Sequence, residues 1–489
     1  MKNRDINNST EAQEFLSRRD FVRQGACASL GITGLVNMLT QLRVISGAMA
    51  GEGPGGDDDY KALVCVFLSG GNDCNSTLVP VSTANYNQYV KDRGNLALPQ
   101  EDLLALSPKS YSDGVDYGLH PNLAPLKTLF DNENLGILAN VGTLVAPTTR
   151  DQYLSGAVEV PTQLFSHSDQ SVQWQSSISD QPFSTGWGGR VADLLHTLNQ
   201  NAQVSMSISL GGTNSFQVGT DTTQYAVDTE GSISFVGYGD NYGNALNEDG
   251  TFKSNNAGRR LKGFLDIMNL EPANLMQQAF SGKVNRAYEN DLLLTEALAD
   301  VNLTTVFPDS SAADQLNMVA QLIAAHDKLS QRRQIFFVEV RGYDTHADQL
   351  VAHGDLMTEL GEALKAFYDA TVEIGEQDNV TSFTSSDFGR TYTPNGGSGT
   401  AGADHAWGSH QFIMGGCVKG GDIYGDMPEL VVDGPDDVNG DRGRWIPTTS
   451  VDEYSSTLAR WFGVSDTQMD STFPNLHRFN NRDLGFFKA

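Results

Sequence analysis

Short apolar runs are the feature that most constrains the fold of this chain. Ala62–Leu68, Leu135–Val141 and Ile335–Val340 are largely apolar and are bounded by polar residues. Runs of this length are typical of strands that are buried on both faces of a sheet. Val380–Thr384 and Gln411–Met414 are predicted to form a fourth and a fifth strand.

Segments with helical patterns separate these predicted strands. We expect helices near residues 123–130, 169–178, 188–198, 258–280, 283–300, 311–334, 356–374 and 451–462. Residues 200–260 are rich in Gly, Ser, Thr and Asn and are expected to form an irregular or β-rich insertion. Alternating strands and helices predict an α/β fold, in which helices cover both faces of a mostly parallel central sheet.

The N-terminal segment has the pattern of an export signal. Ser17–Phe21 contains paired arginines, a mildly apolar stretch follows, and Ala48–Ala50 offers a cleavage site. We therefore expect a twin-arginine signal peptide at 1–50, a flexible linker at 51–61 and a single domain at 62–489. The alternative is that the paired arginines begin an ordinary amphipathic helix. The signal predicts a periplasmic or extracellular protein that is exported in the folded state.

The charge of the chain restricts its partners. The 489 residues carry a formal net charge of −28, because 60 acidic residues outnumber 32 Lys and Arg. This charge repels nucleic acid and anionic lipid, so neither is expected as a partner. The chain has no run of about 20 apolar residues, so no stable membrane span is expected in the mature protein. A small anionic substrate would need a local positive centre, which a bound metal ion supplies most simply.

The cysteines point to a structural role. Cys27 lies in the predicted signal, which leaves Cys65, Cys74 and Cys417. The lack of a Cys-x-x-Cys motif excludes a zinc ribbon and a thioredoxin-like motif. One disulfide is compatible with three cysteines, and the alternative is that they are small buried residues.

Carboxylates and imidazoles lie at the ends of several predicted strands. These residues are Asp73 after the first strand, Asp344 and His346 after the third, Asp387 after the fourth and His405 before the fifth. Ligands of open α/β sheets bind beyond the carboxyl ends of the strands, so the five side chains can converge. Each residue alone has a structural interpretation, such as a helix N-cap, and the prediction depends on the set.

The residue types of this set indicate a metal site. Mixed His and carboxylate ligands suit zinc, manganese or iron, and oxygen ligands suit calcium. We expect one or two divalent ions, and two ions about 3.5–4 Å apart would suit hydrolysis at phosphorus or sulfur. Arg390 could clamp an anionic group. Ser166 and His167 directly precede the predicted helix at 169–178, and a helix N-terminus is where anions bind and a hydroxyl can be activated, although an ordinary N-cap at Ser168 or Asp169 fits equally well.

Short motifs along the chain resemble the bacterial family called domain of unknown function 1501, exported sulfatase-like proteins of the alkaline phosphatase superfamily. The matching stretches are Val66–Asp73, Gly118–Leu123, Ser166-His167, Gly186–Arg190, Gly342–His346, Phe388–Thr391, Asp404-His405, Gly420–Gly425 and Ile446–Thr449. Together they span most of residues 62–463. The resemblance implies an alkaline-phosphatase-like three-layer α/β sandwich.

The resemblance also implies a division of the ligands between two metal sites. By position, Asp73 and Asp387 would serve one site, and Asp344, His346 and His405 would serve the other.

The sequence departs from the superfamily pattern in two places. Phe388 stands where the superfamily has a metal-binding imidazole. The nucleophile has no single match, because Thr143, Ser166 and the Ser76-Thr77 pair all fit, and the Cys/Ser-x-Pro-x-Arg motif of sulfatases is missing.

Two functions are therefore open. The first is an exported metal-dependent hydrolase of phosphate or sulfate esters, with Ser166, His167 and Arg390 as catalytic residues and a small anionic ester as substrate. The second is a catalytically silent exported binding or assembly protein that retains the fold and has an exported protein as its partner. The missing imidazole and the missing nucleophile motif favour the second function.

Overall fold

The folded domain begins slightly before the predicted boundary. The computed structural model describes residues 59–232, 235–239, 242–247, 249–270, 274–438, 440 and 442–488. The predicted signal peptide and residues 51–58 of the predicted linker lie outside the described residues. Residues 59–61 belong to the domain, because Asp59 forms an ion pair with Arg333, Tyr60 is buried and strand β1 (Lys61–Ser69) starts at Lys61.

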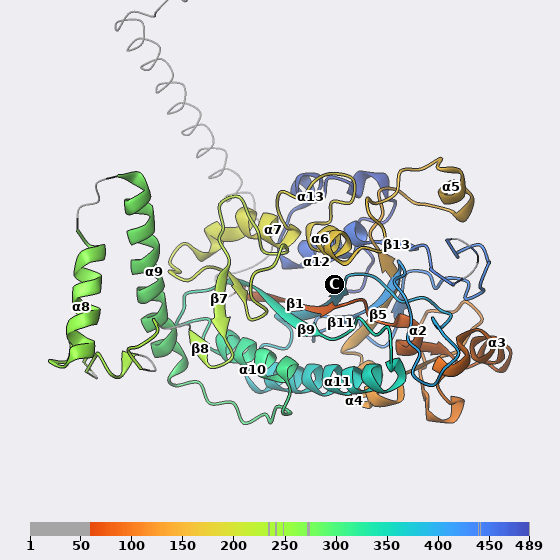
Figure 1. Ribbon diagram of the computed structural model, residues 1–489, viewed down its shortest axis with the longest axis horizontal. Helices are drawn as coiled ribbons and strands as arrows, with labels where there is room; N and C mark the ends of the chain where they lie inside the picture. Colours follow the sequence, from red (N-terminus) through yellow and green to blue (C-terminus); the bar gives the residue numbers. More distant parts are fainter. Residues whose placement is uncertain are drawn as a thin grey trace, which may run out of the picture. The chain divides into compact units, whose positions relative to one another are not determined.

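In the described part of the chain, the main sheet contains ten strands (Figure 1). Their order across the sheet is β12 (Ile423–Tyr424), β5 (Leu135–Gly142), β11 (Ser409–Met414), β10 (Val380–Ser386), β1, β9 (Arg333–Arg341), β6 (Ser207–Ser209), β7 (Tyr225–Asp228) and β8 (Gly231–Ser232), and β13 (Thr449–Ser450) pairs with β5. The five predicted strands are all present. All pairings are parallel except those of β11 with β10 and β5 and that of β8 with β7. The predicted α/β fold with a mostly parallel sheet is confirmed.

Strand register and direction bring the site residues to one edge of the sheet. Leu68 of β1 lies opposite Val340 of β9 and Ser386 of β10, so the three carboxyl ends are level. The segments that carry the predicted ligands leave the sheet at this edge. β11 runs in the opposite direction, so the loop that precedes it, which contains His405, lies at the same edge.

Helices cover both faces of the sheet (Figure 1). One layer consists of α4 (Ala124–Asp131), α10 (Ser311–Ala324) and α11 (Gln349–Glu373), and the other of α6 (His167–Ser176), α7 (Trp187–Leu195), α12 (Val451–Phe462) and α13 (Asp466–Thr472). Successive residues of a strand point to opposite faces. Val64 and Val66 of β1 accordingly join the aliphatic core with α10 and α11, whereas Phe67 stacks on Phe337 in an aromatic cluster on the other face.

Two predicted helices have different bounds in the structure. The expected helix at 258–280 is replaced by α8 (Asn256–Met268) and α9 (Leu275–Leu298), and the side chain of Asn274 caps α9 by accepting a hydrogen bond from Gln277 N. The expected helix at 311–334 ends as α10 at Ala324. A turn follows in which Ser330 has a φ of 54°, a left-handed conformation that cannot continue a helix.

The remaining elements lie around this core. A small sheet contains β2 (Leu78–Pro80), β3 (Leu104–Ala105) and β4 (Tyr117–Leu119), and further helices are α2 (Cys74–Thr77), α3 (Thr83–Arg93) and α5 (Arg150–Ser155). Residues 200–260 contain the short strands β6 to β8 between loops, and then the start of α8. Among the described residues, none of the helices has the length and apolarity needed to cross a membrane. Cys65, Cys74 and Cys417 are all free thiols, and the first two are buried.

Candidate metal centre

Three histidines and one aspartate meet at the carboxyl edge of the sheet. The Nε2 atoms of His167, His346 and His405 lie 3.4, 3.0 and 3.3 Å from Oδ1 of Asp344. His405 Nε2 is also 3.1 Å from His167 Nε2 and 2.9 Å from His346 Nε2. His167, Asp344 and His405 form a mutually close set of possible ligands, and His346 contacts two members of that set.

The second ring nitrogen of each histidine has its own acceptor. Nδ1 of His167 is 2.6 Å from Oδ2 of Asp387, and Nδ1 of His346 is 3.1 Å from Oδ1 of Asp404. Nδ1 of His405 is 2.8 Å from the carbonyl oxygen of Phe165. Carboxylates and carbonyls only accept hydrogen bonds, so each Nδ1 donates to its acceptor, and a neutral ring then keeps the Nε2 lone pair that a metal ion binds. Ligating histidines in metal sites have the same outer partners.

This arrangement fits a cation. Imidazole lone pairs at 2.9–3.1 Å repel one another unless a proton or a metal ion lies between them. Ligand atoms around a tetrahedral zinc ion, with bonds of about 2.0–2.1 Å, are about 3.3 Å apart. The distances among His167, Asp344 and His405, 3.1 to 3.4 Å, lie near this value, and those from His346 to His405 and Asp344 are 2.9 and 3.0 Å. In addition, Oδ1 of Asp387 is buried without a hydrogen-bond partner.

Asp344 stays ionised at the centre of this group. Burial raises the pKa of its carboxyl, but the hydrogen bond and charge of Arg390 outweigh burial and lower the pKa to about 2. The hydrogen bond with Asp387 raises the pKa of His167, and burial lowers the pKa of His405. The centre therefore offers an anionic oxygen and imidazole nitrogens to a metal ion.

Two glycines allow the loops to come this close. Gly70 and Gly71 follow β1 with φ values of 118° and 88°, in the region that favours glycine. A Cβ on Gly70 would lie 2.4 Å from the backbone nitrogen of Asp344, and one on Gly71 would lie 2.6 Å from the ring of Phe388. The pair thus permits direct packing of the loop after β1 on the loops after β9 and β10.

The imidazole missing at position 388 is compensated from another element. His167, at the first turn of α6, is the residue that contacts Asp387. The ring of Phe388 packs against two of the imidazoles, with its centroid 4.7 Å from that of His167 and 4.6 Å from that of His405. Phe388 therefore orients two imidazoles instead of supplying one.

Two predicted site residues, Asp73 and Arg390, have other roles in the structure. Asp73 is buried apart from the cluster and pairs with Arg93. Arg390 is fully buried and donates to the carbonyls of Gly70, Gly71, Tyr343 and Ala403 as well as to Asp344, so it is not available as the expected anion clamp. Ser166 is the residue before α6, and its hydroxyl is 2.6 Å from Oδ2 of Asp169.

Several residues that sequence patterns mark only weakly hold the histidine rings from outside the cluster. Asp404 adjoins His405 in one of the motifs, but its contact with His346 depends on the folding of the loop. Arg442 forms an ion pair with Asp404, and Arg444 donates from Nε to the carbonyl of His405. Phe165 has a φ of 70°, and its carbonyl accepts the hydrogen bond from His405.

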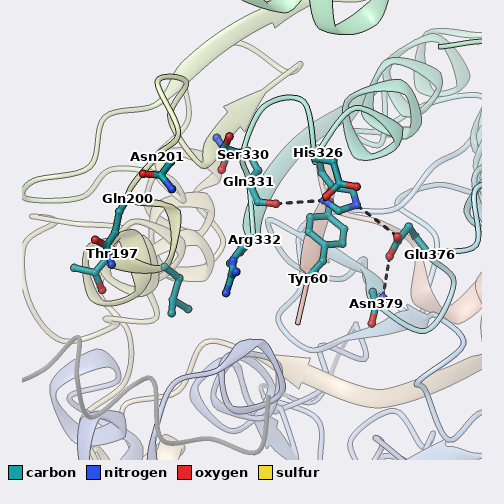
Figure 2. Close-up of a pocket in the computed structure, with 12 residues that line it drawn as sticks. Tyr60, Thr197, Gln200, Asn201, His326, Ser330, Gln331, Arg332, Glu376 and Asn379 are labelled. Carbon is teal, nitrogen blue, oxygen red and sulfur yellow. Dashed lines mark hydrogen bonds and ion pairs between the residues drawn. The ribbon is translucent and has the colours of Figure 1, made fainter. Parts of the chain in front are cut away.

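A separate pocket lies at the opposite edge of the sheet (Figure 2). It has a volume of about 740 Å³, and its lining includes Tyr60, Arg332 and Asn379, which directly precede β1, β9 and β10. His326 stacks on Tyr60 with ring centroids 3.9 Å apart, and its Nε2 is 3.5 Å from Glu376. These contacts give His326 a structural role.

A family model covers most of the chain. The model described as "Protein of unknown function (DUF1501)" matches residues 60–471. The chain belongs to the DUF1501 family. A comparison with curated proteins finds no match for this DUF1501 chain.

Solved structures give only weak likenesses to this DUF1501 protein. One is a sulfatase, PsFucS1 from Pseudoalteromonas sp., with 10% identity over 88% of this chain and 72% of the sulfatase and a TM-score of 0.33. Another is Ps i-CgsB in complex with k-i-k-neocarrahexaose, with 8% identity over 87% and 77% of the two chains and a TM-score of 0.31. At these TM-scores the likenesses carry no argument about function.

Proposed function

We propose that this DUF1501 protein is an exported metal-dependent hydrolase of phosphate or sulfate esters. The observation that carries the proposal is the convergence of three imidazole Nε2 atoms on the Asp344 carboxylate. His167, His405 and Asp344 would hold the ion, and His346 adjoins the last two of them. Imidazole nitrogens beside a carboxylate favour zinc, manganese or iron over calcium, which prefers oxygen.

The residues around the centre have distinct tasks in this proposal. Asp387, Asp404 and the Phe165 carbonyl hold the three rings with Nε2 inward. Arg390 keeps Asp344 ionised. A bound divalent ion would polarise the ester oxygen and stabilise the negative charge that develops on it.

Ser166 is the proposed nucleophile. It stands between Phe165, whose carbonyl binds His405, and His167, so both of its neighbours contact the centre. Its hydroxyl donates to Oδ2 of Asp169 at 2.6 Å, and this carboxylate can accept the proton when the oxygen attacks.

The activity can be tested on the mature chain. Residues 51–489, purified without a metal-affinity tag, are loaded with zinc, manganese or iron and assayed with aryl phosphates and aryl sulfates. We expect turnover in the wild type and a loss of at least about 100-fold in Ser166→Ala. Ser168→Ala is the matched control, because Ser168 also contacts Asp169, at 3.1 Å, and is expected to keep full activity. A metal-loaded wild type that turns over none of the esters would contradict the hydrolase.

A second candidate is an exported assembly protein without catalytic activity. Large apolar side chains are exposed on α8 and α9, including Ile267, Met276 at 84% and Phe280 at 61% exposure. Exposed apolar side chains of this size on one pair of helices are typical of protein contacts. The ester assay separates the two candidates, since only the hydrolase turns over substrate.

A further inference from the structure

The first predicted ligand, Asp73, already has a cation of its own. Arg93, the last residue of α3, forms an ion pair with its carboxylate, and both side chains have 0% exposure. The guanidinium is held by three further acceptors, because Nη1 donates to the carbonyls of Thr391 at 3.1 Å and Tyr392 at 2.9 Å and Nη2 donates to Ser76 Oγ at 2.7 Å. Arginine stays protonated in proteins, so this positive charge is permanent.

The hydrogen-bonding capacity of Asp73 is also taken up. Oδ2 accepts from Ser76 Oγ at 2.8 Å and from Gln349 Nε2 as well as from Arg93, and Oδ1 accepts from the backbone of Asn75 at 3.2 Å. Burial alone would raise the pKa of this carboxyl, and Arg93 reverses the direction. The carboxylate is therefore charged and fully coordinated by protein groups.

The expected partner of Asp73 is engaged elsewhere. Oδ2 of Asp387 accepts from His167 Nδ1 and from the backbone nitrogen of Gly70 at 3.3 Å. Asp387 thus accepts a hydrogen bond from the His167 imidazole and does not join Asp73 in a common metal site. Among the described residues, one group of His, Cys, Asp or Glu side chains is close enough to hold a metal ion, and it consists of His167, Asp344 and His405.

From these contacts we propose that the centre binds a single metal ion, and that the guanidinium of Arg93 takes the place of a second cation at Asp73. This inference rests on the metal centre of the proposed function. The charge balance supports it: three carboxylates (Asp344, Asp387 and Asp404) face two guanidiniums (Arg390 and Arg442). One divalent ion makes this group +1, which suits an anionic ester in a chain with a net charge of −28.

Metal stoichiometry tests the proposal without any activity assay. The mature chain is stripped with a chelator, reloaded with zinc, dialysed and measured by mass spectrometry of its metal content. We expect one equivalent of zinc in the wild type and roughly none in His405→Ala. His477→Ala, a control outside the centre, is expected to keep one equivalent. The double variant D73N/R93M removes both charges together, which avoids an isolated buried charge, and is expected to keep one equivalent.

The possible outcomes separate this inference from the proposed function. Two equivalents in the wild type would overturn the single-ion proposal and leave a metal-dependent hydrolase intact. Loss of metal in a folded D73N/R93M variant would overturn it too, because Asp73 would then be a ligand. No metal in the wild type would overturn both proposals. The wild-type measurement decides the question even if the double variant does not fold.

Discussion

At the residue scale, the centre depends on which nitrogen of each histidine carries the proton. Each Nδ1 of His167, His346 and His405 has an acceptor, so a neutral ring has its Nε2 lone pair available to a metal ion beside Asp344. The sequence supports the Asp344–His346 pairing, because a spacing of two places both side chains on one side of an extended segment. It could not show that Asp73 pairs with Arg93, since nothing in the pattern of α3 marks Arg93 as a buried counter-ion.

The outer carboxylate of His167 provides a prediction at this scale. Asp387→Asn removes the negative charge behind the imidazole, and such outer partners contribute about 10- to 100-fold to metal affinity. We expect zinc to bind at least about 10-fold more weakly, with the capacity still one equivalent, in a competition titration against a chromophoric chelator. Asp327→Asn is the control, because that side chain is 94% exposed. An unchanged dissociation constant for Asp387→Asn would remove Asp387 from the centre.

At the scale of elements, strand direction decides whether His405 reaches the site. The predicted strands carried no information on direction, and a parallel β11 would have placed the preceding loop at the opposite edge. The antiparallel pairing of β11 with β10 and β5 brings His405 to the carboxyl ends of β1, β9 and β10. The strands could be predicted because each follows from a local apolar run. The direction of a strand depends on pairing with distant segments, so the contact between His167 and His405 could not be predicted.

The start of α12 gives a second prediction at this scale. Ser450 and Glu453 form the capping box, whereas the carboxyl of Asp452 is fully buried and neither of its oxygens has a hydrogen-bond partner. Burial raises the pKa of Asp452 to about 7, although the neighbouring Ser177 hydroxyl and the charge of Arg190 oppose this. A raised carboxyl pKa means that the folded state holds a proton that the unfolded chain has lost, so stability falls as the pH rises from about 4 to about 7.

Asp452→Asn should remove this loss of stability. One pKa unit corresponds to about 1.4 kcal/mol, so the variant should gain up to about 4 kcal/mol over the wild type at pH 8 and little at pH 4. Urea unfolding at both pH values measures the difference. Asp314→Asn, in the exposed first turn of α10, is the control and should change stability equally at both. An Asp452→Asn variant with the same pH dependence as the wild type would contradict a protonated buried carboxyl.

At the scale of the whole molecule, the proposed metal centre is compatible with the proposed export route. Twin-arginine export moves folded proteins, so a metal centre can be assembled before the chain leaves the cytoplasm. The paired residues Arg18 and Arg19 are the proposed export determinant. Most of the architecture was predictable because buried strands and amphipathic helices are local signals. Three of the family motifs, Gly342–His346, Phe388–Thr391 and Asp404-His405, lie in the loops at the carboxyl edge of the sheet.

Export is tested by changing the paired arginines. The double change Arg18→Lys and Arg19→Lys keeps the charge and removes the motif, so we expect the full-length precursor to accumulate inside the cell. Arg23→Lys is the matched control and should be exported and processed normally. Cell fractionation with a mass measurement of the mature N-terminus gives the result. Normal export of the Lys-Lys variant would mean that another segment directs it.

The most direct test of the central claim is the position of the metal itself. A crystal of the mature chain soaked with zinc, measured at the zinc absorption edge, locates the ion by anomalous scattering. The account predicts one peak about 2.0–2.2 Å from Nε2 of His167, Nε2 of His405 and Oδ1 of Asp344. A peak bound to Asp73, or no peak at the carboxyl edge of the sheet, would contradict it.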